Sequence, residues 1–131
     1  MSTPSAAVRP FARVIARLAA AFATVFALAA CTPAEPIEVG TDTVIVDVRT
    51  PGEYADGHLD GALNIDVQSA TFDAAIAELD PTVSYVVYCR SGNRSAAAID
   101  RMEAAGFTDL VNAGGLQEAA DATGIEIVTG P

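Results

Sequence analysis

The most regular feature of this chain is a pair of short apolar runs, at residues 44–48 and 83–88, that are rich in β-branched and aromatic side chains. Turn-forming residues bound both runs, and this pattern predicts buried parallel strands. Residues 63–65 and 110–111 form shorter runs of the same kind and predict two further strands. The chain is therefore expected to build a sheet from four separate segments.

Apolar residues at helical spacing lie between and after these strands. One apolar face covers residues 72–79 and ends ahead of the helix breaker Pro81. A second face covers residues 98–105, on a helix that begins at about Arg94 and stops at Gly106. These two segments predict amphipathic helices that each cover a sheet with one face.

A short third helix is predicted directly after the first strand. Thr50 is a typical N-cap, Pro51 suits the first helical position and Glu53 completes a capping box, and the helix should end by Gly57. Strands and helices thus alternate along the chain. This order predicts an α/β fold, with a mostly parallel central sheet and helices on both faces.

In such a fold, ligands bind beyond the carboxyl ends of the strands. Asp47, Arg49 and Cys89 fall at this edge of the predicted sheet, because each lies at or just after the end of a predicted strand. Candidate chemistry is therefore expected where these two strands end side by side.

The charges of the chain are unevenly distributed. Arg9, Arg13 and Arg17 are the only charged residues before position 35, and lysine is absent throughout. From residue 31 onward, four arginines stand against 17 acidic residues, which leaves a side-chain charge of −13. This balance argues against nucleic acid as a partner, since phosphate binding depends on Lys and Arg.

The first 30 residues predict a cleaved export signal. Residues 18–30 form an apolar run behind the basic stretch, shorter than the roughly 20 residues that a membrane-spanning helix needs. The run ends in Leu-Ala-Ala-Cys, which resembles the lipobox of bacterial lipoproteins. The resemblance implies a lipoprotein signal peptide at residues 1–30, lipidation of Cys31, and an exported protein that is lipid-anchored to the outer face of the cell membrane or in the periplasm. An uncleaved anchor or a plain secretory signal is the alternative.

The remainder of the chain has room for one domain. Residues 31–41 contain Pro33 and Pro36 and predict a short tether, which leaves residues 42–131 as the folded domain.

Cys31 and Cys89 are the only cysteines. If Cys31 carries lipid, Cys89 is the single thiol of an exported domain and no disulfide can form. Small exported domains usually use cysteines in pairs, so an unpaired thiol is a candidate nucleophile. A thiol that packs as a small hydrophobe is the alternative. The polar residues 90–93 follow Cys89 directly and argue against its burial in apolar surroundings.

Residues 89–95, with the sequence Cys-Arg-Ser-Gly-Asn-Arg-Ser, connect a predicted strand to a predicted helix. A loop that closes onto a helix N-terminus points backbone N–H groups inward, and the helix dipole adds partial positive charge. Gly92 permits the tight path of this loop. The field is expected to lower the pKa of Cys89 and so to raise the fraction of thiolate, the nucleophilic form.

Residues 88–95 resemble the active-site loop of the rhodanese-like sulfurtransferases. Further segments match the pattern of that family in order and at its usual spacings, namely 47–49 with 53–54, 57–65, 106–107 and 114–115. The resemblance covers about residues 42–128 and implies a single rhodanese-like domain. Two departures concern the ends of the domain: there is little room for a helix before residue 42, and the usual Trp after Gly114-Gly115 is missing.

The resemblance implies a sulfur-transfer cycle without a metal or an organic cofactor. Cys89 would be the catalytic residue, attack a small anionic donor such as thiosulfate and pass the sulfur of its persulfide to a thiol or cyanide. Backbone N–H groups of the loop would hold the persulfide, and the side chains of Arg90 and Arg94 would attract the donor. The implied substrate-binding residues are Arg90, Ser91, Gly92, Asn93, Arg94 and Ser95. We expect a monomer whose contact with the membrane is the lipid anchor.

Two other functions stay open. Phosphatases and arsenate reductases use a loop of Cys, five residues and Arg, whereas four residues separate Cys89 from Arg94 here, and a tighter loop favours a single sulfur atom. A non-catalytic rhodanese-like module, which carries persulfide or docks beside membrane enzymes, is the second alternative. An intact Cys89 argues against a catalytically inactive domain.

Five further polar residues have structural as well as chemical interpretations. Arg49 could contact substrate, but a structural ion pair is favoured for an Arg four residues before a Glu. Asp47 could orient Arg49, cap loop N–H groups or transfer a proton. His58, the only histidine, lies in a Gly-His turn without metal-ligating neighbours. Ser91 and Ser95 could donate to the catalytic thiolate or cap the helix.

Lipidation of Cys31 can be tested in a bacterial host that processes lipoproteins. Radiolabelled palmitate should be incorporated into the wild-type chain and not into Cys31→Ser, because only the thioether carries the diacyl group. Cys89→Ser serves as the matched control and should label like the wild type. An unlabelled wild-type chain would exclude the lipoprotein interpretation.

Overall fold

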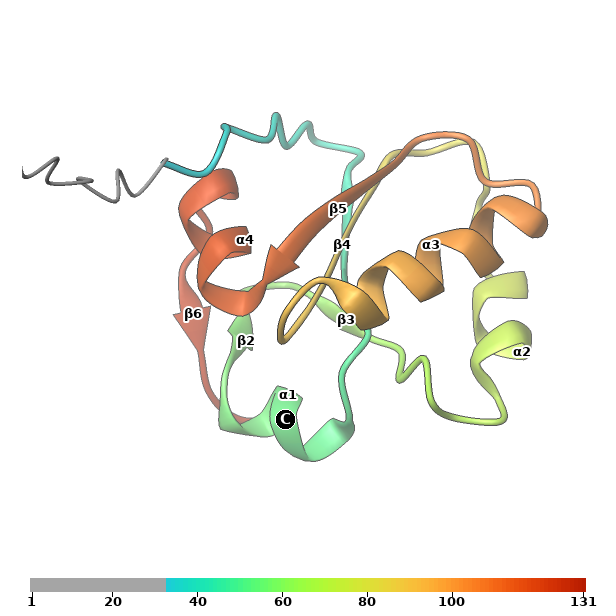
Figure 1. Cartoon of the computed structure of the whole chain (residues 1–131), viewed down its shortest axis with the longest axis horizontal. Coiled ribbons are helices and arrows are strands. Elements are labelled where there is room, and N and C mark those ends of the chain that lie inside the picture. The colour runs from blue at the N-terminus through green and yellow to red at the C-terminus, as the bar shows by residue number, and fades with distance from the viewer. Residues whose placement is uncertain (1–32) are drawn as a thin grey trace, which may run out of the picture. The chain divides into compact units, whose positions relative to one another are not determined.

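The computed structural model describes residues 33–131, which form six strands and four helices (Figure 1). The predicted signal segment and Cys31 lie outside the described residues. In chain order the elements are β1 (Val44–Asp47), α1 (Pro51–Asp56), β2 (His58–Leu59), β3 (Leu63–Asn64), α2 (Phe72–Ala77), β4 (Tyr85–Cys89), α3 (Asn93–Ala104), β5 (Leu110–Gly115), α4 (Leu116–Thr123) and β6 (Ile127–Val128). None of these four helices has the length and hydrophobicity that a membrane span requires.

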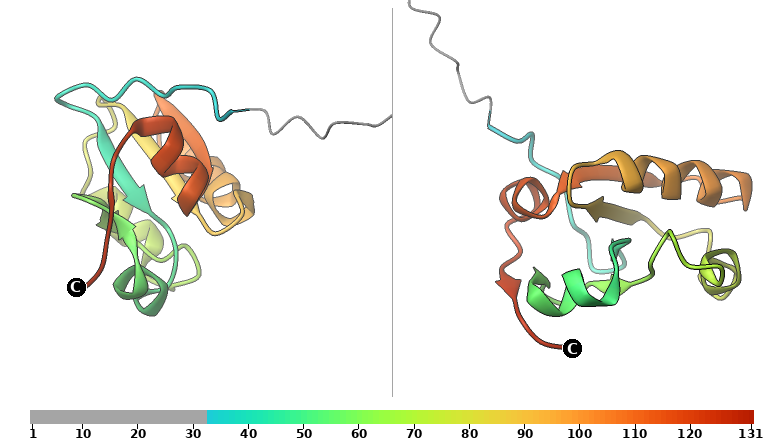
Figure 2. Two further views of the ribbon diagram at one scale, coloured as in Figure 1. Left: turned by 90° about the vertical axis from the view of Figure 1, so that its left-hand side faces the viewer. Right: turned by 60° about the horizontal axis from the view of Figure 1, so that its bottom comes forward.

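Four strands form a parallel sheet in the order β3-β1-β4-β5, and the left view of Figure 2 shows β1, β4 and β5 side by side. The small β2 and β6 pair antiparallel to each other. The predicted α/β fold with a mostly parallel sheet is therefore confirmed. β5 is longer than the two residues predicted, because it continues through Gly114 and Gly115.

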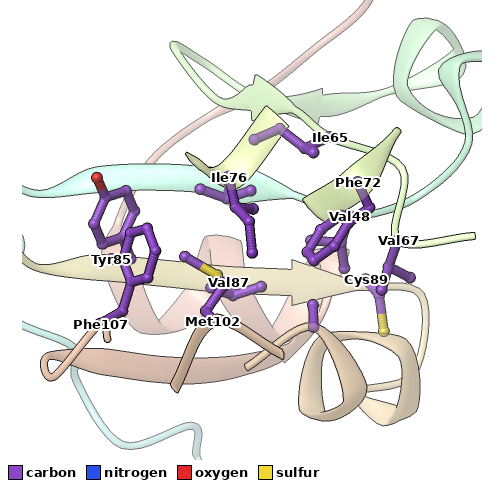
Figure 3. Packing of buried hydrophobic residues seen from close by; sticks show 12 residues of the cluster. Val48, Ile65, Val67, Phe72, Ile76, Tyr85, Val87, Cys89, Met102 and Phe107 are labelled. Carbon is purple, nitrogen blue, oxygen red and sulfur yellow. The ribbon is translucent and has the colours of Figure 1, made fainter. Parts of the chain in front are cut away.

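Alternate residues along the strands point to opposite faces of the sheet, and each face carries its own apolar cluster. Val46 and Val87 belong to the first cluster, together with Phe72 and Ile76 from α2 and with Met102 from α3 (Figure 3). The second cluster contains Ile45 and Val86 from the strands and Ala119 from α4. Helices thus cover both faces of the sheet, as predicted. The packed core fixes the parallel strands, so their carboxyl ends lie at the same edge of the sheet.

The capping box at the start of α1 has the predicted geometry. The Thr50 hydroxyl oxygen accepts from the Glu53 N–H at 3.3 Å, and Glu53 Oε2 accepts from the Thr50 N–H at 3.2 Å. These bonds satisfy N–H groups that a helix start otherwise leaves unpaired. They also fix the position of Glu53 in the first turn of α1, which follows the Asp47–Arg49 segment.

A buried ion pair closes the end of β1. Asp47 is fully buried and Arg49 is 6% exposed, and Arg49 Nη2 lies 2.6 Å from Asp47 Oδ2 and 2.5 Å from the Gly57 carbonyl oxygen. The predicted structural ion pair of Arg49 is therefore confirmed. Its partner is Asp47, whereas Glu53, the acidic residue at helical spacing, binds elsewhere.

Residues 33–43 contain no helix, in agreement with the short spacing ahead of β1. The Ile37 N–H donates to the Ala122 carbonyl at 2.8 Å, and the Ile37 side chain packs against the second apolar cluster. Contacts of the folded unit thus extend to Ile37, within the segment predicted as a tether.

Candidate active site

Cys89 is the last residue of β4 and is fully buried. It belongs to the first apolar cluster, at the opposite end from Tyr85 and Phe107 (Figure 3). The prediction that Cys89 avoids apolar surroundings is therefore wrong for one side of this residue. The reason is the period of the strand, since Tyr85, Val87 and Cys89 all point to the same covered face of the sheet.

The other side of the Cys89 sulfur faces hydrogen-bond donors. The Gly92 N–H donates to Sγ at 3.0 Å, and the Ser95 hydroxyl oxygen lies 3.6 Å from Sγ. Burial raises the pKa of Cys89, but hydrogen bonds from the Ser95 hydroxyl and from the backbone of Ser91, Ser95 and Gly92 outweigh burial, so the pKa lies below its ordinary value. This is the direction that the loop sequence predicts. The thiolate is stabilised inside the protein by fixed donors.

Glycines allow the loop to lie against β5. Gly92, the N-cap of α3, has φ +88°, a conformation that side chains disfavour. A Cβ atom at Gly92 would lie 3.4 Å from the Gly114 Cα, and a Cβ atom at Gly115 would lie 2.6 Å from the Arg90 carbonyl oxygen. The latter distance is shorter than any normal contact. The Gly114-Gly115 pair is thus the surface on which the Cys89 loop rests.

Asn112, on β5, fastens the loop from the side, although the sequence motifs do not single it out. Its Nδ2 donates to the Gly92 carbonyl at 3.1 Å, and its Oδ1 accepts from the Gly114 N–H at 3.0 Å and from the Ser95 hydroxyl at 2.7 Å. The sequence held one signal for such a role, a polar residue within a strand and two positions before the Gly114-Gly115 pair. Its contacts depend on the pairing of β4 with β5, which is not visible along the chain.

Arg94 makes a two-pronged ion pair with Glu53. Arg94 Nη1 and Nη2 lie 2.7 and 2.8 Å from the two carboxylate oxygens, and this bond from Arg94 is the main reason why the pKa of Glu53 falls to about 2. The pair ties α3 to α1. The guanidinium of Arg94 therefore faces a carboxylate, which differs from the expectation that it offers a free charge to the donor.

An open cleft of about 630 Å³ lies beside the loop. Its walls come from the loop, α1, α4, β6 and the ends of β1 and β5; the residues that line it are Arg49, Glu53, Asp56, Arg90, Ser91, Gly115, Leu116, Gln117, Glu118 and Ile127. Three of them are acidic. Arg49 is committed to Asp47, whereas Arg90 is exposed and, among residues 33–131, is the only arginine without an ion pair.

The remaining predicted residues occupy distinct places. Both carboxylate oxygens of Asp47 accept from Arg49, so Asp47 acts as an orienting group. Ser95 is buried on the first turn of α3 and contacts both the Cys89 sulfur and the Gly92 carbonyl, whereas Ser91 is exposed at the cleft. Asn93 is exposed on the first turn of α3, and no hydrogen bond of its side chain is present among the described residues.

His58 has a structural role, as its turn predicts. Its Nδ1 lies 2.8 Å from the Tyr54 carbonyl oxygen, and its ring stacks on the Tyr54 ring with centroids 3.6 Å apart. In the part of the chain that the structure describes, no three His, Cys, Asp or Glu side chains are grouped as a metal site would need.

Comparison with known proteins identifies similar sequences. The profile of the family described as Rhodanese-like domain matches residues 34–122. The chain is 36% identical over 75 residues to thiosulfate sulfurtransferase PspE of Escherichia coli, a match that covers 57% of this chain and 72% of PspE. It is 38% identical over 71 residues to thiosulfate sulfurtransferase GlpE of Pseudomonas paraeruginosa, a match that covers 54% of this chain and 63% of GlpE.

Among solved structures, this fold is similar to a rhodanese with anions from E. coli. That comparison has a TM-score of 0.57 and 32% identity, and it covers 67% of this chain and 99% of the other. The family profile spans the strands and the loop that position Cys89.

The contact between Gly115 and the loop predicts the effect of one added methyl group. Gly115→Ala should displace the Arg90 carbonyl, lower stability by about 1–3 kcal/mol through overpacking and slow the alkylation of Cys89 by iodoacetamide, because the loop N–H groups move away from the sulfur. Thermal unfolding and peptide mass spectrometry, which reads Cys89 apart from Cys31, measure the two effects.

Gly52→Ala is the matched control, since no atom lies within 4 Å of the added Cβ. It should leave Cys89 alkylation unchanged. Wild-type reactivity and stability in Gly115→Ala would show that the close approach of the loop to β5 is unimportant.

Proposed function

The chain belongs to the rhodanese-like domain family, and on that basis we propose that it is a sulfurtransferase that carries sulfane sulfur as a persulfide on Cys89. Thiosulfate or a similar anion is the proposed donor, and a thiol or cyanide is the proposed acceptor. The observation that carries the proposal is the Cys89 sulfur itself, held 3.0 Å from the Gly92 N–H at the start of α3. The sulfurtransferases PspE and GlpE are similar over about half of this chain.

The proposed cycle has two displacement steps. The Cys89 thiolate attacks the outer sulfur of thiosulfate, a new S–S bond forms, and the old S–S bond breaks as sulfite leaves with the electron pair. The outer sulfur of the persulfide is then attacked by cyanide or by a thiolate, and Cys89 regains its negative charge. Each step exchanges one anionic nucleophile for another, so no oxidant, reductant or metal is needed.

The loop supports this chemistry through its backbone. In both steps the negative charge sits on a sulfur atom, first on Sγ and then on the outer sulfur. Fixed N–H donors at a helix N-terminus stabilise such charge without reorganisation. A thiol buried without these donors would stay neutral and unreactive.

Two features support sulfur transfer over phosphoryl or arsenate chemistry. The loop between Cys89 and Arg94 has four intervening residues, one fewer than the phosphatase pattern. Arg94, the residue that would embrace a tetrahedral oxyanion, is bound by both oxygens of Glu53. A non-catalytic module that carries persulfide remains the second candidate, because it would use the same sulfur and the same donors.

We further propose that the domain is exported, anchored by lipid on Cys31 and monomeric. The basic and apolar character of the first 30 residues and the Leu-Ala-Ala-Cys sequence support this location. A side-chain charge of −13 from residue 31 onward would keep the domain apart from anionic membrane lipids, so the lipid would be its attachment.

The central experiment treats the full chain with thiosulfate and maps the product by mass spectrometry. We expect Cys89 to gain one sulfur atom and cyanide to remove it as thiocyanate. Cys89→Ser should lose both reactions, and Cys31→Ser is the matched control that should keep both. Gain of sulfur without release to cyanide or thiols would favour the carrier module. No sulfur adduct, with turnover of an aryl phosphate, would favour the phosphatase.

Arg90 is expected to capture the anionic donor, because it is the unpaired cation of the cleft. Arg90→Gln should raise the KM for thiosulfate roughly three- to tenfold and leave kcat nearly unchanged, since the charge acts on binding. Arg90→Lys keeps the charge and should recover most of the loss. Steady-state kinetics at two salt concentrations measure the effect, and an unchanged KM in Arg90→Gln would contradict it.

A further inference from the structure

The carboxamide of Asn112 links three parts of the Cys89 loop. Its Nδ2 donates to the Gly92 carbonyl, and this bond fixes the orientation of the carboxamide. Oδ1 therefore points at the Gly114 N–H and the Ser95 hydroxyl. The contact from Ser95 is the shortest of the three, at 2.7 Å. Asn112 is exposed, whereas Ser95 is fully buried. A surface residue therefore holds a buried hydroxyl that also lies beside the Cys89 sulfur.

The Ser95 hydroxyl has one proton and three acceptors within reach. Its oxygen lies 2.9 Å from the Gly92 carbonyl oxygen, 2.7 Å from Asn112 Oδ1 and 3.6 Å from Cys89 Sγ. The Gly92 carbonyl already accepts from the Ala96 N–H and from Asn112 Nδ2, each at 3.1 Å, and an oxygen has two lone pairs. Two acceptors therefore remain for the Ser95 hydroxyl proton, Asn112 Oδ1 and the Cys89 sulfur.

We propose that Asn112 is a positioning residue that sets how readily Cys89 ionises, by competing with the Cys89 sulfur for the single hydroxyl proton of Ser95. With a neutral thiol, the proton bonds to Asn112, which is the nearer and better acceptor. With a thiolate, the charge draws the proton to Sγ, because a hydrogen bond to an anion is about twice as strong as a neutral one. The Ser95–Asn112 bond is lost in that exchange, so Asn112 opposes ionisation.

The same competition fits the proposed cycle. In the persulfide the charge lies on the outer sulfur, so the inner Sγ becomes a weak acceptor and the Ser95 proton returns to Asn112. The outer sulfur is then held by the backbone N–H groups. This consequence rests on the proposed role of Cys89 as a persulfide carrier, whereas the ionisation of Cys89 can be measured without it.

Charged groups from several elements surround the loop. They are Arg94 on α3 with Glu53 on α1, Asp47 and Arg49 at the end of β1, Asp66 after β3, Arg90 in the loop and Glu118 on α4. β5, which carries Asn112, has no titratable side chain. A substitution at Asn112 therefore leaves every neighbouring charge in place, unless it adds one.

The test uses the full chain with Cys31→Ser, so that Cys89 is the single thiol, and measures the rate of iodoacetamide alkylation against pH. Asn112→Leu removes the competing acceptor, so the midpoint should move to lower pH. Asn112→Asp adds charge and a stronger acceptor, so the midpoint should move to higher pH. Each shift corresponds to a roughly three- to tenfold change in the thiolate fraction near neutral pH. Circular dichroism monitors folding, and Asn112→Ala replaces the leucine variant if that variant is unfolded.

Ser95→Ala provides the decisive control, because it removes the proton for which the two acceptors compete. When Asn112→Leu is added to Ser95→Ala, the pH midpoint of Cys89 alkylation should stay where Ser95→Ala alone puts it. A shift of equal size with and without Ser95, or a rise in the midpoint for Asn112→Leu, would overturn the proposal in favour of a purely structural Asn112. Persulfide formation from thiosulfate is followed separately: if the wild type forms none, the proposed function fails while the alkylation profile still decides the role of Asn112.

Discussion

Burial of the Cys89 sulfur at the end of a central strand is the constraint on which the rest of this structure depends. A buried thiol loses the water that would stabilise its ionised form, and the protein must supply that stabilisation from fixed groups. Donors from Gly92 in the loop and from Ser95 on the first turn of α3 provide it, and Gly114 and Gly115 let the loop lie close to β5. The fold thus places a potential anion where fixed donors reach it.

Most of the arginines near the edge of the sheet that carries Cys89 are bound in ion pairs. Asp47 holds Arg49 beneath the cleft, and Glu53 holds Arg94 between α1 and α3, so two arginines contribute to order more than to attraction. Arg90 is left as the free cation of the cleft in a domain of strongly negative charge. At physiological salt, screening over about 8 Å weakens the field of the acidic groups outside the cleft, so a local cation can act within a strongly acidic domain.

The hydrophobic period of the strands and helices, and the spacing of capping and loop residues, made much of this architecture predictable. The two apolar runs, the capping box at Thr50 and the loop from Cys89 to Ser95 each depend on residues that are neighbours along the chain. The burial of Cys89 and the partner of Arg94 were not predicted, although a strand period of two, applied from Tyr85 to Cys89, would have indicated the covered face. Glu53 had a local role in its capping box, and nothing in the sequence pattern indicated that its oxygens would also bind a residue on α3.

By itself, the sequence determined the α/β order of elements, the candidate nucleophile, the glycines of the loop and the helix that follows it, because these are set by local sterics and by hydrophobic period. Only the tertiary structure decided which arginine remains free, which strand residue fastens the loop, and which groups share the Ser95 proton. Those outcomes depend on the pairing of β4 with β5 and on the approach of α1 to α3. Contacts between distant segments are selected by packing of the whole core, and hydrogen-bond partners follow from distances that exist only once the chain has folded.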